Sequence, residues 1–150
     1  MIGLLQRVSE AAVQVDGECV ASIGPGLMVL VGVERGDGEP QAARLAERLA
    51  SYRVFADAAD RMNLSVADTG GAVLLVPQFT LPADTRKGTR PSFTPAAEPA
   101  EGARLFEALL HHLRARIADV QTGRFGAHMR VRLVNDGPVT FWLRVAPGED

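Results

Sequence analysis

The stretch MRVRLVNDGPVTFWLRV, residues 129–145, contains two strand-like runs on either side of a turn sequence. Residues 129–134 alternate apolar and polar side chains, and residues 139–145 are rich in β-branched and aromatic ones, both of which are typical of strands. Between them, residues 135–138 (NDGP) suit a hairpin turn, but the proline after the glycine removes a backbone donor and fixes one φ angle. The stretch therefore predicts two strands, and it leaves open whether the segment between them is an ordinary turn or a functional one.

The rest of the chain predicts more strands and two helices. Residues 2–8, 12–16 and 27–33 are β-like segments separated by glycine-containing turns, and residues 72–76 form a buried strand that ends at a proline. Apolar residues at three- and four-residue intervals predict the helices: Ala42, Leu45, Ala46, Leu49 and Tyr52 in the first, and Leu105, Phe106, Leu109, Leu110, Leu113 and Ile117 in the second.

No internal repeat or linker divides the sequence. We therefore expect a single α+β domain over residues 1–145 with a short C-terminal tail, 146–150. Its predicted architecture is a mixed β-sheet curling toward a barrel, with two main amphipathic helices packed on it.

Composition narrows the function classes. The chain has 150 residues, 47% of them hydrophobic, which fits one domain. Its net charge of −2 gives no sign of nonspecific nucleic-acid binding. No stretch approaches the roughly 20 apolar residues that cross a bilayer, and the start lacks a signal-like block. We expect a cytoplasmic protein with no membrane partner. Arg86, Lys87 and Arg90 nevertheless cluster in the sequence, so local phosphate contacts remain open.

The common catalytic constellations are missing from the sequence. His111 and His112 are adjacent on a predicted helix and point in different directions, while His128 stands alone, so no zinc pair is expected. Cys19 is the only cysteine. A Gly-x-Ser-x-Gly elbow and the glycine-rich phosphate loops do not occur. We expect no metal and no organic cofactor.

Four separated motifs resemble one known family. They are residues 78–81 (QFTL), 83–93 (ADTRKGTRPSF), 121–125 (QTGRF) and 135–142 (NDGPVTFW). In this order and spacing they closely resemble D-aminoacyl-tRNA deacylase (D-tyrosyl-tRNA deacylase), and the resemblance runs from residue 4 to Val145. The chain departs from the family at Pro77, where a serine is usual, so a mechanism that needs a hydroxyl there is in doubt.

The resemblance implies an enzyme that hydrolyses the ester bond of D-aminoacyl-tRNA to a free D-amino acid and tRNA. It implies a homodimer with Gln78, Phe79 and Thr80 as the catalytic segment. Because such an ester is already activated, positioning of a water and stabilisation of the oxyanion that forms on the ester carbonyl supply much of the needed acceleration, and backbone N–H groups at a strand end are able to provide both. The resemblance suggests that the substrate's ribose 2′-hydroxyl assists.

The resemblance also implies a chiral filter. In the family a Gly-cis-Pro pair reaches into the partner's pocket and excludes L-substrates, a role that falls here on Gly137 and Pro138. Arg7 is expected to brace this pair, and Phe125 and Met129 to line the pocket or the seat of the terminal adenine. A backbone wall ignores side-chain identity, so broad D-scope and some cleavage of glycyl-tRNA are expected.

Two alternatives stay open at this point. One is an editing deacylase for glycine or small L-residues, with a trans Gly137–Pro138 bond and a roomier pocket. The other is a noncatalytic RNA-end-binding dimer in which Pro77 marks a lost activity.

Overall fold

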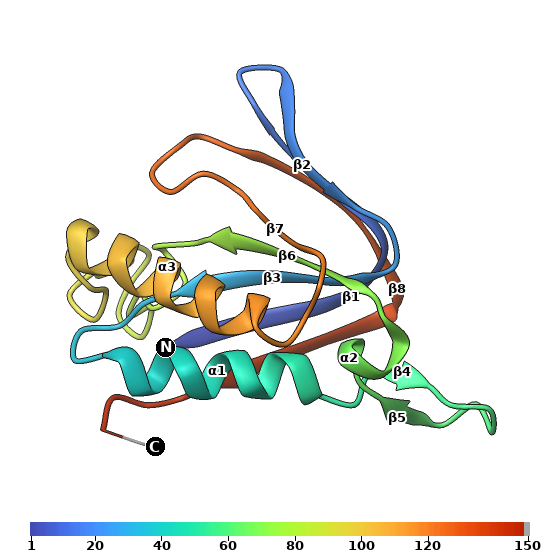
Figure 1. The fold of residues 1–150 in the computed structure, drawn as a ribbon. Helices are drawn as coiled ribbons and strands as arrows, with labels where there is room; N and C mark the ends of the chain where they lie inside the picture. Colours follow the sequence, from blue (N-terminus) through green and yellow to red (C-terminus); the bar gives the residue numbers. More distant parts are fainter. Residues whose placement is uncertain (149–150) are drawn as a thin grey trace.

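The computed structural model describes residues 1–148 and consists of a mixed β-sheet with helices against one face (Figure 1). The strands of the main sheet are β1 (Ile2–Val15), β2 (Glu18–Ile23), β3 (Gly26–Gly32), β6 (Ala72–Pro77), β7 (Val120–Thr122) and β8 (Arg130–Arg144). A second, two-stranded sheet pairs β4 (Phe55–Ala56) with β5 (Met62–Leu64). Glu149 and Asp150, which end the predicted C-terminal tail, lie outside the described residues.

The long strand β1 joins the two parts of the sheet. One edge of β1 pairs with β8, and the other edge pairs with β3 over Ile2–Val8 and with β2 over Ala11–Val15. The order is therefore β2-β1-β3-β6-β7, with β3-β6 and β6-β7 parallel and the other pairs antiparallel. The prediction of two separate strands in residues 2–16 is wrong. They form one strand, because β8 pairs with β1 across the residues between the two predicted strands. Strand β2 was not predicted.

Strand β8 contains both runs of the stretch 129–145, so the hairpin interpretation of the segment between them is wrong. Both runs pair with β1 in the same antiparallel direction, with Gln6 opposite Thr140 and Val8 opposite Asn135. Residues 136–139 are extra on the β8 side and form a bulge. The local turn sequence is overridden because β1 is long enough to pair with both runs.

Two main amphipathic helices cover one face of the sheet, as predicted: α1 (Glu39–Ser51) and α3 (Pro99–Arg114) (Figure 1). Each has a proline in its first turn, where no N–H is needed. Helix α3 ends at Arg114, before Ile117, which is buried all the same. A short helix that was not predicted, α2 (Val66–Thr69), is capped by Ser65, whose Oγ accepts from Asp68 N at 3.1 Å.

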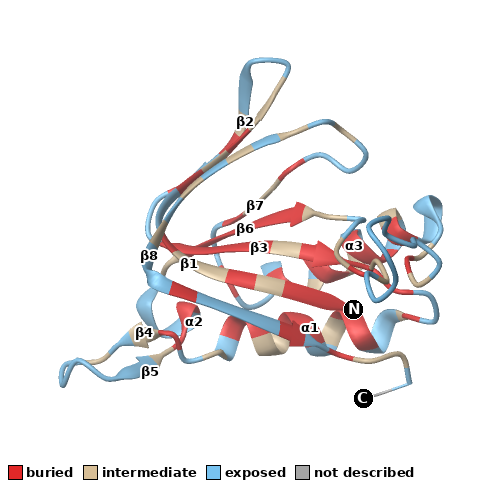
Figure 2. Cartoon of the chain, turned by 180° about the vertical axis from the view of Figure 1, so that it is seen from behind, coloured by how far each residue is buried: buried red, intermediate tan, exposed pale blue. Residues whose placement is uncertain are grey.

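The strands separate two apolar cores. In β6, Val73 and Leu75 belong to the core on the helix side, whereas Leu74 and Val76 belong to the core on the other side of the sheet, as expected for a period of two. Figure 2 shows that β6 is buried along most of its length. Ser22 N in β2 donates to Gln121 Oε1 in β7 at 3.0 Å. Because β2 and β7 are at opposite ends of the strand order, this contact confirms that the sheet curls toward a barrel.

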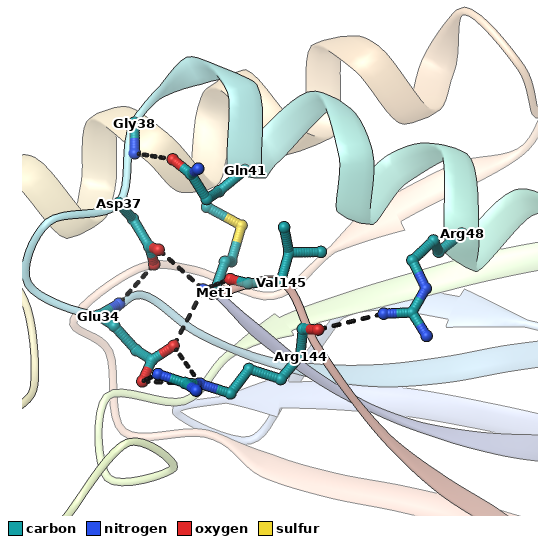
Figure 3. A network of polar contacts seen from close by, with 8 residues as sticks. All are labelled: Met1, Glu34, Asp37, Gly38, Gln41, Arg48, Arg144 and Val145. Atoms are coloured by element: carbon teal, nitrogen blue, oxygen red, sulfur yellow. Dashed lines mark hydrogen bonds and ion pairs between the residues drawn. The ribbon is translucent and has the colours of Figure 1, made fainter. Parts of the chain in front are cut away.

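A buried polar network ties β1, the β3–α1 loop and the end of β8 together (Figure 3). The Met1 amino group donates to Asp37 Oδ1 at 2.8 Å, to Glu34 Oε2 at 3.1 Å and to Val145 O at 2.6 Å. Arg144 Nε donates to Glu34 Oε2 at 3.0 Å. With both carboxylates nearly buried, these partners offset the cost of removing the charges from water.

The stability of this network should depend on acid pH through Glu34. Burial pushes the pKa of Glu34 upward, but hydrogen bonds from Arg144 and the Met1 amino group outweigh burial and lower that pKa below 4.5. The native state therefore binds fewer protons than the unfolded state, so the stabilisation is complete above 4.5 and is lost as pH falls through the lowered pKa.

Urea denaturation of the wild type and Glu34→Gln over a pH series measures this effect. The difference in free energy of unfolding should be largest near neutrality and shrink as pH falls below 4.5. Asp37, whose pKa is raised by burial, is present in both proteins. A difference that stays constant into the acid range would contradict the assignment.

Candidate active site

An apolar cavity of about 470 Å³ lies where β3 and β6 end and α3 begins. Gln78, Phe79, Phe125 and Met129 line it, whereas Thr80 lies beside Phe79 and does not. The remaining lining residues come from the ends of these elements and from two loops: Val31, Val33, Arg35, Pro77, Phe93, Ala96, Ala97, Glu98, Pro99, Gly102, Phe106, Gly126 and Ala127. A cavity of this size and character suits one small organic group.

The chain leaves β6 through a tight turn that frees two backbone donors. Gln78 N still donates to Val31 O at 2.8 Å and so extends the β3–β6 ladder by one bond. The next carbonyls are used within the turn: Leu81 N donates to Gln78 O at 3.2 Å, and Ala83 N donates to Thr80 O at 3.1 Å. The N–H groups of Phe79 and Thr80 meet no acceptor within residues 1–148. Of the predicted segment, these two N–H groups are available to a ligand, and that of Gln78 is not.

Side chains fix the shape of the turn. Gln78 Nε2 donates to Thr80 Oγ1 across it. The Phe79 ring is 66% exposed and packs against Phe93 with ring centroids 5.4 Å apart. The Phe125 ring, which also lines the cavity, has its centroid 6.4 Å from that of Phe106. Three exposed aromatic rings, those of Phe79, Phe93 and Phe125, thus line the cavity.

The bulge in β8 is held by its own hydrogen bonds. Asn135 Oδ1 accepts from Val139 N at 2.8 Å, and Asn135 Nδ2 donates to Thr140 Oγ1 at 2.8 Å. Within the loop that these bonds close, the Gly137–Pro138 peptide bond is cis and Gly137 has φ +148°.

Arg7 braces the bulge against a neighbouring segment. Its Nε donates to Asp136 O at 2.8 Å, and its Nη1 donates to Val54 O at 2.7 Å. The side chain is only 17% exposed; its bond to Val54 O is partly buried, and its bond to Asp136 O lies at the surface. A carbonyl of the bulge and a carbonyl next to β4 are therefore joined through one guanidinium group.

Within one chain the two predicted groups do not come together. Arg7, Gly137 and Pro138 do not line the cavity. The bond from Arg7 to Val54 places the bulge beside β4, and both views show β4 at the opposite end of the molecule from the C-terminal end of β6 (Figures 1 and 2). Gly137 and Pro138 therefore lie away from the cavity of their own chain.

Among the lining residues that sequence reasoning did not place at the site, Phe93 and Gly102 carried a usable signal. Phe93 belongs to a quoted motif, but its ring was not placed at the site. Gly102, in the first turns of α3, would place a Cβ 3.3 Å from Phe125 Cζ. A glycine inside a strongly helical pattern was the available signal that another group packs closely there.

Within residues 1–148, no group of three or more His, Cys, Asp or Glu side chains is arranged to hold a metal ion. The helices in that range are too short or too polar to cross a membrane.

Known proteins are similar to this chain over nearly its full length. The family model for D-Tyr-tRNA(Tyr) deacylase matches residues 4–144. A protein of Thioalkalivibrio sulfidiphilus named D-aminoacyl-tRNA deacylase is 67% identical over 147 residues, covering 98% of this chain and 99% of the relative. A protein of the same name from Nitrosococcus oceani is 65% identical over 147 residues, covering 98% and 95%.

Solved structures share the fold. One, named c-Myc DNA Unwinding Element Binding Protein, matches with a TM-score of 0.93 at 34% identity and covers 97% of this chain and 99% of that chain. A probable eukaryotic D-amino acid tRNA deacylase matches with a TM-score of 0.81 at 18% identity, covering 95% and 97%. The resemblance found in the sequence is confirmed: the chain belongs to the D-Tyr-tRNA(Tyr) deacylase family of enzymes.

Proposed function

We propose that this protein hydrolyses the ester bond of D-aminoacyl-tRNA in the cytoplasm, and that it acts as a homodimer. The observation that carries the proposal is the pair of unpaired N–H groups of Phe79, which lines the apolar cavity, and of Thr80, the residue next to it. Neighbouring donors of this kind suit the oxyanion that forms when water attacks an ester. The high identity to proteins named D-aminoacyl-tRNA deacylase supports this substrate.

The chemistry uses water and the groups of the chain and the substrate. Water adds to the ester carbonyl carbon, the bond from that carbon to the ribose 3′ oxygen breaks, and the proton lost by water ends on that oxygen. The N–H groups of Phe79 and Thr80 stabilise the negative charge on the carbonyl oxygen, and each such donor is typically worth about 10²–10³ in rate. The ribose 2′-hydroxyl of the substrate assists the proton transfer.

Rejection of L-substrates is assigned to Gly137 and Pro138 of the second copy. These residues are braced by Arg7 and Asn135 and lie away from the cavity of their own chain, so only another copy's cavity is within reach. On β8, Val134, Phe141 and Trp142 are 47%, 38% and 56% exposed, and an apolar surface of this kind suits a subunit interface. A rigid backbone wall admits the D-side chain and, because glycine has none, also glycyl-tRNA.

Single-turnover deacylation of matched D-, L- and glycyl-tRNA by the purified protein tests the proposal. Rapid cleavage of the D-substrate and slower cleavage of glycyl-tRNA, with the L-substrate spared, is the expected result. Cleavage of the L-substrate would favour the editing alternative. Binding of tRNA without turnover of any of the three would reveal an RNA-end-binding dimer.

Replacing Thr80 with alanine should lower kcat only by roughly tenfold, well below the loss of about 10²–10³ that follows removal of an oxyanion donor. The substitution removes the hydroxyl that Gln78 holds but leaves the backbone N–H in place. Single-turnover rates for Thr80→Ala, with Thr80→Ser as the matched control that keeps the hydroxyl, measure the effect. A loss beyond a thousandfold would show that the hydroxyl itself carries the chemistry.

A further inference from the structure

We propose that Lys87, Arg90 and Arg124 form a phosphate clamp at the mouth of the cavity, which holds the RNA strand next to its 3′-terminal nucleotide. The inference rests on the proposed function, because it takes the terminal adenosine to lie in the cavity. The ligand chemistry is that of successive phosphodiesters on a single strand.

The three cations belong to the two loops that supply Phe93 and Phe125 to the cavity lining. Arg124 directly precedes Phe125, and Arg90 lies three residues before Phe93, and both rings line the cavity. Figure 1 shows the loops that carry them, residues 82–98 in yellow-green and 123–129 in orange, at the end of the molecule where α3 begins. We take the RNA strand to leave the cavity between these two loops.

The two acidic residues of the loop 82–98, Asp84 and Glu98, are already paired with other arginines. Arg86 grips Asp84 through two bonds, Nε to Oδ1 at 2.9 Å and Nη2 to Oδ2 at 2.8 Å, and holds the pKa of that carboxyl at about 2. Glu98 is paired with Arg35 at 3.1 Å. None of the three proposed clamp residues forms an ion pair with another residue in the range 1–148.

The loop is built to present its charges at a fixed place. Asp84 and Ser92 exchange two backbone hydrogen bonds, of 2.8 and 2.9 Å, which close residues 85–91 into a tip. Gly88 turns this tip with φ +60°. Both Lys87 and Arg90 are exposed there. The ring of Phe93, three residues after Arg90, packs against the exposed ring of Phe79, and aromatic rings next to a basic groove are a common platform for single-stranded RNA.

The net charge of the chain is −2, so the protein as a whole does not attract RNA. Affinity for a polyanion therefore has to come from local groups, and counterion release from single strands gives a salt slope of about −0.7 per neutralised phosphate.

Binding of deacylated tRNA, which carries no amino acid, over a salt series tests the clamp directly. Lys87→Gln, Arg90→Gln and Arg124→Gln should each weaken binding and reduce the slope of log affinity against log salt by about 0.7. The matched control is Arg116→Gln, an exposed arginine just past the far end of α3, which should leave the slope unchanged. Unchanged slopes in the three clamp variants, or an equal loss in the control, would overturn the proposal.

Two substrates separate this inference from the proposed function. With D-aminoacyl-tRNA as substrate, the clamp variants should have a raised KM and an unchanged kcat. With D-aminoacyl-adenosine, which carries no phosphate, they should have the same rates as the wild type. Equal losses on both substrates would mean that the cations act on the adenosine or on folding, against the clamp. If the wild type cleaves neither ester, the proposed function fails, and the salt slopes with deacylated tRNA still decide the clamp.

Discussion

Replacing Gly137 with alanine is expected to slow D-aminoacyl-tRNA cleavage by about a hundredfold, because a displacement of the order of 1 Å at a positioning group has that effect. Gly137 has φ +148°, which disfavours any side chain. An added Cβ would lie 2.6 Å from Val139 Cγ2 and 2.9 Å from Val139 N, with Arg7 Nη2 at 3.3 Å. The Val139 side chain is able to rotate away, but its backbone N is not, so the bulge has to move.

The measurement is the single-turnover rate on D- and L-substrates, with circular dichroism to confirm the fold. Gly17→Ala is the matched control: Gly17 also has a positive φ, +79°, but no neighbouring atom within 4 Å of the added Cβ, so its rates should match the wild type. The Gly137 variant should also discriminate less between D and L. If Gly137→Ala kept the wild-type rate and the wild-type discrimination, the bulge would not be part of the active site.

The substitution Gly26→Ala is expected to lower the free energy of unfolding by about 4 kcal/mol or more, at the severe end of single substitutions. An added Cβ would stand 1.8 Å from Ala72 O and 2.8 Å from both Ala72 N and Ala72 C. These are main-chain atoms of the residue that pairs with Gly26 in the β3–β6 ladder. Relief is possible only if the two parallel strands separate at this point.

Urea denaturation measures the loss, and Gly24→Ala is its control. Gly24 lies two residues earlier, and a Cβ there meets nothing within 4 Å, so its effect should stay within about 0.5 kcal/mol. A Gly26 variant as stable as the control would show that β3 and β6 separate at little cost.

The parts of the fold that repeat a local pattern could be predicted. Leu45 and Leu49 in α1, and Leu105 and Leu109 in α3, are fully buried, because a stripe at helical spacing has to face a core. The continuity of β1 and the bulge in β8 could not be predicted. Each depends on the edge that the other strand offers, and no local window contains both strands.

The candidate site could likewise be predicted only in part from local sequence. The end of β6 was marked by Pro77, after which the polar side chains of Gln78 and Thr80 appear, so the segment could be found from the sequence. Phe93 reaches the cavity only because its loop is folded back by the Asp84–Ser92 bridge. That return path depends on tertiary contacts.

The pairing of β1 with β8 also has a consequence for biosynthesis. Gln6 and Thr140 are hydrogen-bonded neighbours separated by 134 positions. While the ribosome makes the residues between them, one edge of β1 has no native partner, and an unpaired strand edge is a template for association with other chains. Contacts so distant in sequence also slow folding. The nascent chain should therefore be most prone to aggregate, and most dependent on chaperones, until β8 has left the exit tunnel.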